Sequence, residues 1–342
     1  MKKKTSILLL VAALFAAIAV PAWAVGIMPE KMMDIYMDSI YENDSATVAD
    51  FSKAADMRIT SEDAQIALPA AGENAIEVVR EMENGLFDMQ ITLPSTSEDI
   101  ALLSDRAVYK EDGYTQAVQI ADSDIHIVTS VLNDEAQSEF AYDFALPAGA
   151  YMEYADYGTD NSVLIYNEAG EAVYTLVPGI AKDANGKDVD FVWDLQGNTL
   201  VYCIADGQEL AYPVNVSVNA VAAYGFSHYF NEESSYKNYW SVHNGLYENG
   251  HKLTLNPNWQ NLYAVTTPPG FSSHKAASWS TVYNKFSDDY RWKRPDSMKS
   301  QYECHYSFCP SYAESIGCGT WDLETWRTGQ ANLTNLCNPG VE

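Results

Sequence analysis

The chain has 342 residues, with 47 acidic against 20 basic side chains and a formal net charge of −27. A hydrophobic fraction of 47% and an aromatic fraction of 12% exclude a mostly disordered chain. The charge argues against a general nucleic-acid binder, because phosphates would be repelled, and against docking on an anionic membrane surface. The length is sufficient for two domains that each have a core.

The first 24 residues have the three parts of a secretory signal peptide. Residues 2–4 are lysines, residues 7–20 form an apolar run without charge, and Ala22 and Ala24 place small side chains at the −3 and −1 positions of a cleavage site. The run is shorter than the ~20 residues of a membrane-spanning helix, so we expect cleavage near Ala24 rather than an uncleaved anchor. The sequence therefore predicts a secreted, extracellular protein that is not held in the membrane.

The remaining chain divides into two parts of different composition. Residues 25–218 carry 36 acidic and 8 basic side chains, whereas residues 219–342 carry 11 acidic and 9 basic ones. Six of the eight tryptophans, five of the six histidines and four of the five cysteines also follow residue 219. We interpret this shift as a domain boundary. The charge argument against nucleic-acid binding is therefore strong for the whole chain and weaker for residues 219–342 alone, which are nearly neutral.

Residues 25–59 are predicted to form a helical lead segment. Pro29 suits the first turn of a helix, and apolar residues then recur at the spacing of one helix face. That face consists of Met32, Met33, Tyr36, Met37, Ile40 and Tyr41. A methionine-rich face could grip a partner, but we expect it to pack on the protein's own core.

Residues 60–218 show the pattern of an antiparallel β domain. Clusters of Gly, Asn and Asp recur about every ten residues, as turns do between short strands. The intervening runs, rich in β-branched and aromatic residues, are residues 116–120, 125–131, 163–166, 172–177, 189–193 and 199–204. The pattern predicts an acidic, mainly β domain, either an antiparallel sandwich or a curled sheet. We expect its carboxylates to form a solvated face.

No metal site and no cofactor are expected. Residues 183–190 resemble the start of a calcium loop, but Lys187 and Asp188 occupy the positions where an EF-hand loop needs an oxygen ligand and a glycine. A hairpin turn at residues 185–186, which are Asn-Gly, fits better. The histidines of the C-terminal part also lack the close spacing of a zinc site.

An α+β architecture is predicted for residues 219–342. The first of two predicted helices has one apolar face, formed by Trp279, Val282, Tyr283 and Phe286. The second is predicted over residues 297–309, because it begins at a serine cap and ends before a proline. We expect these helices and the cysteines around them to form a small disulfide-bonded domain.

Several blocks of residues in this part carry a family resemblance. They are Leu253-Thr254-Leu255-Asn256-Pro257, Trp279-x-x-Val282-Tyr283-x-Lys285, Ser297-Met298-x-x-Gln301-x-x-Cys304-His305, Trp321-Asp322-Leu323-Glu324-x-Trp326-Arg327 and Cys337-Asn338-Pro339. Over residues 253–340 the chain resembles secreted bacterial proteins, many of them actinobacterial, that carry the domain of unknown function 2599. In members of that family, the block around Trp-Arg usually has the sequence Asn-Leu-Glu-Pro-Trp-Arg-Pro. This chain has Asp322 in place of the Asn, and Thr325 and Thr328 in place of the two prolines. The resemblance implies no assigned activity.

The four C-terminal cysteines are expected to be oxidised in a secreted protein. Cys304 and Cys309 point to different sides of the predicted helix, which makes a bond between them poor geometry. The spacing leaves the two other pairings open. The family resemblance favours Cys304–Cys337 with Cys309–Cys318, because the matching blocks contain only the first pair. Cys203 lies in a strand-like run and is expected to be a buried lone thiol.

Two sets of residues are candidates for catalysis. Cys304-His305 invites interpretation as a thiol nucleophile and its base, but neighbours on a helix point about 100° apart and a disulfide would remove the thiolate. His305, Glu324 and Arg327 could serve as general acid, general base and anion clamp in phosphodiester or glycosidic cleavage. The structural alternative is an ion pair between Glu324 and Arg327, with His305 hydrogen-bonded in a small core.

The C-terminal part is rich in aromatic residues, which either fill a core or form an exposed binding platform. The candidate binding residues are Trp279, Trp292, Gln301, Trp321 and Trp326. We expect a non-enzymatic extracellular recognition module that binds a cell-wall glycan or a surface protein through the aromatic C-terminal domain. The alternative is a secreted hydrolase or antibacterial effector that uses His305, Glu324 and Arg327.

Overall fold

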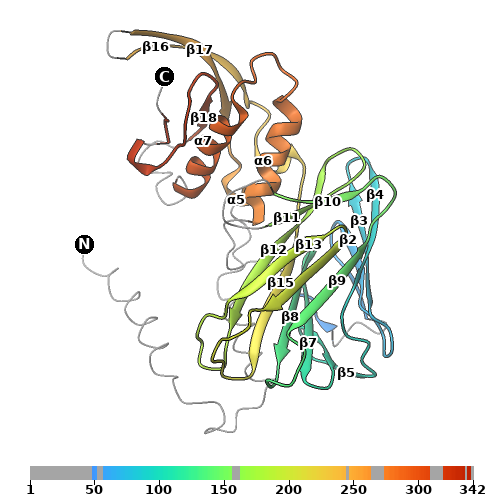
Figure 1. Cartoon of the computed structure of the whole chain (residues 1–342). Helices are drawn as coiled ribbons and strands as arrows, with labels where there is room; N and C mark the ends of the chain where they lie inside the picture. Colours follow the sequence, from blue (N-terminus) through green and yellow to red (C-terminus); the bar gives the residue numbers. More distant parts are fainter. Residues whose placement is uncertain are drawn as a thin grey trace, which may run out of the picture.

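The computed structural model describes residues 48–51, 57–155, 162–243, 246–262, 273–308, 319–335 and 337–339. The signal peptide predicted over residues 1–24 and the helix predicted over residues 29–41 lie outside these ranges. Figure 1 shows a two-sheet β sandwich with helices and a small third sheet at one end. The strand pairs are antiparallel in all three sheets. The prediction of a mainly β, antiparallel fold followed by α+β elements is confirmed.

The first sheet of the sandwich has seven strands among the described residues. Their order is β1 (Arg58–Thr60), β2 (Ala64–Ala67), β3 (Ala75–Met82), β4 (Gly85–Thr92), β9 (Glu139–Ala145), β14 (Thr199–Ile204) and β13 (Phe191–Gln196). Buried and exposed residues alternate along β4 and β9. This alternation places one face of the sheet in a core and the other in water.

The second sheet has eight strands in the described part of the chain. Their order is β10 (Tyr151–Tyr154), β11 (Val163–Tyr166), β12 (Ala172–Lys182), β15 (Val214–Ala222), β8 (Asp124–Val131), β7 (Tyr114–Ala121), β6 (Ala107–Lys110) and β5 (Asp99–Leu102). Every residue of β8 and β15 is buried. The centre of this sheet is therefore covered on both faces.

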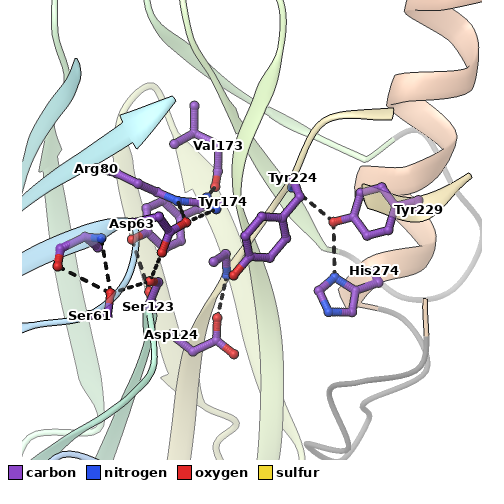
Figure 2. Close-up of polar contacts among 12 residues, drawn as sticks. Ser61, Asp63, Arg80, Ser123, Asp124, Val173, Tyr174, Tyr224, Tyr229 and His274 are labelled. Carbon is purple, nitrogen blue, oxygen red and sulfur yellow. Dashed lines mark hydrogen bonds and ion pairs between the residues drawn. The ribbon is translucent and has the colours of Figure 1, made fainter. Parts of the chain in front are cut away.

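Apolar side chains from both sheets form one core between them. In β3 the inward-facing series begins with Ile76 and Val78 and continues with Arg80, which is only 1% exposed. An arginine at an inward position costs free energy unless its charge and its hydrogen bonds are satisfied. The groups that satisfy it gather at the end of the sandwich nearest the helices (Figure 2).

The C-terminal part combines helices with a three-stranded sheet. Its described elements are α4 (Phe226–Tyr229), β16 (Ser235–His243), β17 (Leu246–Leu255), α5 (Trp259–Leu262), α6 (Ser273–Phe286), α7 (Pro295–Phe308), β18 (Trp321–Glu324) and the 3₁₀ helix η3 (Leu333–Asn335). Strands β16, β17 and β18 pair in that order, and β16 and β17 extend from the body of the molecule as a ribbon (Figure 1). Side chains from α6, α7, β17 and β18 share a second core.

The second core continues into the sandwich. Leu164 on β11 and Ala172 on β12 belong to it, and α6 packs beside β12. The Nδ2 group of Asn284 also donates a hydrogen bond to the carbonyl of Gly170 at 2.7 Å. Strand β15 runs to Ala222, so the shift in charge near residue 218 falls inside a strand of the larger sheet. The C-terminal helices therefore rest directly on the sandwich.

The segment compared with a calcium loop forms a tight turn. Oδ1 of Asp183 accepts hydrogen bonds from the backbone N–H groups of Asn185 and Lys187, each at 2.9 Å. Gly186 has a φ of +76°, a conformation that glycine adopts without strain. The Asp183 carboxylate is thus occupied by its own turn. The turn is closed by an isolated bridge between Lys182 and Asp188, and it joins β12 of one sheet to β13 of the other rather than the two paired strands of a hairpin.

Candidate functional site

Two of the predicted binding tryptophans lie in the core of the C-terminal part. Trp321 on β18 and Trp279 on α6 are 0% and 3% exposed. The ring of Tyr302 lies 5.4 Å from the ring of Trp321 and 5.1 Å from that of Trp279, measured between ring centres. Their burial leaves neither ring a face for a ligand.

Gln301 is fully buried and joins α7 to β18. Its Oε1 accepts a hydrogen bond from the backbone N–H of Glu324 at 2.8 Å, and its Nε2 donates to the carbonyl of the same residue at 3.2 Å. The backbone N–H and carbonyl of Glu324 would otherwise pair with a neighbouring strand, and here they pair with the Gln301 side chain. Gln301 therefore holds the strand to the helix.

The two remaining candidate tryptophans are half-buried. Trp292 follows α6 and packs 5.7 Å from Trp279. Trp326 follows β18 and stacks on Tyr239 at 4.6 Å, in the space left by the missing side chain of Gly250. Each is held by a neighbouring ring, and each keeps part of its surface accessible.

His305 has its ring contact with Trp321, whereas Glu324 and Arg327 contact each other. Trp321 and Leu323 face the core, so alternation along β18 turns Glu324 to the opposite face. The ring of His305 instead stacks on Trp321, with ring planes 9° apart. This geometry separates the proposed acid from the proposed base.

Glu324 and Arg327 form the ion pair of the structural alternative. Nε of Arg327 donates a hydrogen bond to the Glu324 carboxylate, and its Nη1 donates to the carbonyl of Pro339 at 2.8 Å. Burial raises the pKa of Glu324, and burial lowers the pKa of His305 to about 4. These residues are partners within the fold rather than groups facing a substrate.

One predicted disulfide is present. Cys304 on α7 is bonded to Cys337, and their Cα atoms are 5.4 Å apart. Cys309 and Cys318 lie outside the described residues. Cys203 on β14 is the free cysteine of the described residues and is half-buried, less enclosed than the sequence predicts. The bond attaches the C-terminal residues to α7.

A cleft of about 530 Å³ opens where the sandwich meets the first C-terminal residues. Its walls are the turn between β1 and β2, the end of β3, the turn between β7 and β8, and the segment from Ala223 to α4. Five carboxylate residues line it, namely Glu62, Asp63, Glu81, Glu83 and Asp122, against one arginine, Arg80. We call this feature the acidic cleft.

The inner wall of the acidic cleft is an ion pair between the buried Arg80 and the half-buried Asp63. Nε and Nη2 of Arg80 donate hydrogen bonds to Oδ2 of Asp63 at 3.0 and 2.9 Å, and Nη1 donates to the carbonyl of Val173 on β12 (Figure 2). Ser123 donates to the other carboxylate oxygen of Asp63 and lies 2.7 Å from the hydroxyl of Ser61. Arg80 thus connects the two sheets, and its partners fix its position.

Aromatic rings extend this wall toward the helices. The Arg80 guanidinium lies 4.6 Å from the ring centre of Tyr224, and that ring stacks on His228 at 4.1 Å. The backbone N–H of Tyr224 donates to the hydroxyl of Tyr229 at 3.1 Å, and this hydroxyl is 3.2 Å from Nδ1 of His274 in the first turn of α6 (Figure 2).

The two histidines of this network are neutral near pH 7. Burial, together with the nearby charge of Arg80, lowers the pKa of His228 to about 4. Burial also lowers the pKa of His274 to about 3. With Glu62, Glu81, Glu83 and Asp122 exposed at the rim, the acidic cleft carries a net negative charge. Its electrostatics favour a cation.

Within the described ranges, no group of three or more His, Cys, Asp or Glu side chains could hold a metal ion. None of the helices described has the length and apolar character needed to cross a membrane. Comparison of the chain with protein-family models, with curated proteins and with solved structures finds no match. The resemblance of residues 253–340 to the domain of unknown function 2599 therefore stays a prediction.

Sequence reasoning did not single out the residues of the acidic cleft. The one available signal is the alternation of β3, because Arg80 continues the inward series of Ile76 and Val78. An arginine at such a position requires a buried counter-charge. The sequence does not say which of 36 carboxylates in residues 25–218 supplies it.

Proposed function

We propose that this protein is a non-enzymatic extracellular recognition protein that binds a basic segment of a surface protein in the acidic cleft. The observation that carries the proposal is the cleft itself, with exposed carboxylates at its rim and a fixed inner wall. A lysine or arginine side chain at the rim would donate charge-assisted hydrogen bonds to these carboxylates. Because the wall is already ordered, binding would cost little reorganisation.

The charge of the whole chain supports a cationic partner. A net charge of −27 raises the encounter rate with basic segments and repels anionic polymers. The negative charge of the sandwich would attract a basic partner over a distance, before the partner contacts the cleft. Between the two expected ligand classes, a surface protein is therefore favoured over an acidic cell-wall glycan.

Secretion is the second part of the proposal. The pattern of residues 1–24 predicts export and cleavage near Ala24. The Cys304–Cys337 disulfide supports a location outside the reducing cytoplasm.

The recognition proposal is favoured over the hydrolase alternative because His305, Glu324 and Arg327 are used within the fold. The stacking of His305 on Trp321 and the ion pair of Glu324 with Arg327 engage these three side chains within the fold.

Calorimetric titration of the full chain tests the ligand class. The probes are an oligolysine peptide, an oligoglutamate peptide and a neutral soluble cell-wall glycan. We expect saturable binding of oligolysine that weakens as salt is added, and no binding of the other two. Saturable binding of the glycan alone, or of no probe, would overturn the proposal.

A further inference from the structure

The residues that line the acidic cleft are also the residues that hold the C-terminal part to the sandwich. Asp63 fixes Arg80, Arg80 lies against Tyr224, and the backbone of Tyr224 is bonded to Tyr229. Tyr229 in turn contacts His274 at the start of α6. Figure 2 shows these residues between the β1–β2 turn and α6, with the hydrogen bonds on either side of the Arg80–Tyr224 contact drawn as dashed lines.

We propose that occupation of the acidic cleft is coupled to the docking of α6, so that the cleft regulates the C-terminal part. This inference rests on the proposed function for the identity of the cleft as the binding site. A ligand that contacts Asp63 or Tyr224 acts on groups whose positions also set that of His274. By linkage, docking of α6 favours the ligand to the same extent that the ligand favours docking.

The packing at the junction leaves its side chains little room to move independently of one another. Tyr229 is fully buried and His274 is 2% exposed, so neither can move without opening the interface between α4 and α6. On the cleft side, Tyr224 and His228 are only half-buried. A change at the cleft therefore reaches α6 through side chains that have no alternative space.

The coupling can be measured without any ligand. Hydrogen exchange of the α6 amides reports the opening of this helix from the sandwich. Asp63→Asn removes the charge that fixes Arg80 and keeps the size of the side chain. We expect it to speed exchange in residues 273–286 by about 10-fold, while the amides of β7 and β8 change much less.

A second ion pair supplies the matched control. Asp105 pairs with the buried Arg106 at 2.8 Å, and the side-chain exposures of this pair, 33% and 6%, resemble those of Asp63 and Arg80, 26% and 1%. Asp105→Asn is therefore expected to leave exchange in α6 unchanged. Equal effects of the two variants on α6 would mean general destabilisation and would overturn the proposal.

A double-mutant cycle tests the connection itself. Tyr229→Phe removes the hydroxyl that bridges Tyr224 and His274 and keeps the ring. If the two sites are coupled, the double variant Asp63→Asn/Tyr229→Phe speeds α6 exchange no more than the stronger single variant. Effects that multiply would show two independent sites and would contradict the coupling.

A final comparison separates failure of the coupling from failure of the proposed function. Saturating oligolysine is expected to slow α6 exchange in the native chain but not in Tyr229→Phe. Oligolysine that binds without slowing α6 exchange would refute the coupling alone. If oligolysine does not bind, the proposed function is refuted. The hydrogen-exchange measurements on the variants still test the coupling, because they need no ligand.

Discussion

Asp63 and Arg80 are 17 residues apart in the chain, yet their side chains meet at 2.9 Å and close one end of the sandwich. Arg80 is almost completely buried, whereas Asp63 retains contact with the acidic cleft. The pair therefore belongs both to the core and to the site. Arg80 can occupy an inward position of β3 because Asp63 and the carbonyl of Val173 satisfy its charge and its hydrogen bonds.

Loss of Asp63 should destabilise the fold. In Asp63→Ala the Arg80 charge stays buried without its counter-charge, which costs about 3 kcal/mol. Urea unfolding of the variant and the native chain would measure this as a lower midpoint with an unchanged slope. Asp63→Ala combined with Arg80→Met should recover much of the loss, because the buried charge is then absent. A double variant no more stable than Asp63→Ala would refute this explanation.

The buried histidines should make the protein less stable in acid. His274 has a pKa of about 3 in the fold, against about 6.5 in an unfolded chain. The unfolded chain therefore binds the proton first as the pH falls, and stability decreases from about pH 6.5 toward pH 3. Between pH 7 and pH 5 this histidine accounts for about 2 kcal/mol.

The variant His274→Gln tests that assignment. It retains a hydrogen-bonding group beside Tyr229 but does not titrate, so its stability should change less between pH 7 and pH 5 than that of the native chain. His228, His126 and His305 also have a lowered pKa and still contribute in the variant. An unaltered pH dependence in His274→Gln would assign the acid sensitivity to other groups.

Gly250 should tolerate no side chain. A Cβ atom there would lie 2.4 Å from a ring carbon of Trp326, so Gly250→Ala must displace the ring that stacks on Tyr239. We expect a loss of about 1–3 kcal/mol by thermal unfolding. Gly319→Ala is the control, because a Cβ there meets nothing within 4 Å. Equal stability of the two variants would contradict this packing.

The disulfide should stabilise the C-terminal part. Its two cysteines are 33 residues apart, and closing a loop of this size contributes about 3 to 4 kcal/mol in the chain-entropy model. The variant Cys304→Ser/Cys337→Ser should lose that stability under non-reducing conditions. A variant that unfolds at the same denaturant concentration as the native chain would show that the bond adds nothing.

The sequence predicted the local elements better than the contacts between them. The spacing of Trp279, Val282 and Phe286 predicted α6, and the predicted bounds of α7 are within two residues of those observed. The predicted cap was wrong, because α7 begins at Pro295 and Ser297 lies inside its first turn. Strands β11 and β14 have the bounds predicted from their runs of β-branched and aromatic residues. Such patterns are local and can be found in a single sequence.

The candidate site was harder to predict because its residues are distant in sequence. Trp321 and Gln301 have the same residue types as surface binding groups, and only packing shows that they are buried. Asp63, Arg80 and Tyr224 come from a turn, a strand and a segment more than 140 residues further along. Strand pairing brings them together, and no local pattern contains that information.

The central claim is that a cationic partner binds in the acidic cleft, and charge-matched variants test it most directly. Since a chain of charge −27 attracts any polycation, oligolysine affinity must be compared between variants of equal charge. Glu62→Gln/Glu83→Gln removes two carboxylates from the rim of the cleft, and Glu77→Gln/Asp88→Asn removes two from the exposed face of β3 and β4.

Calorimetric titration of the native chain and of both variants with oligolysine measures the loss of affinity that each pair of substitutions causes. We predict that the cleft variant weakens binding by about 10-fold and that the strand-face variant weakens it by less than about 2-fold. Equal weakening by the two variants would contradict the claim, because it would show attraction to the charge of the whole sandwich rather than recognition in the cleft.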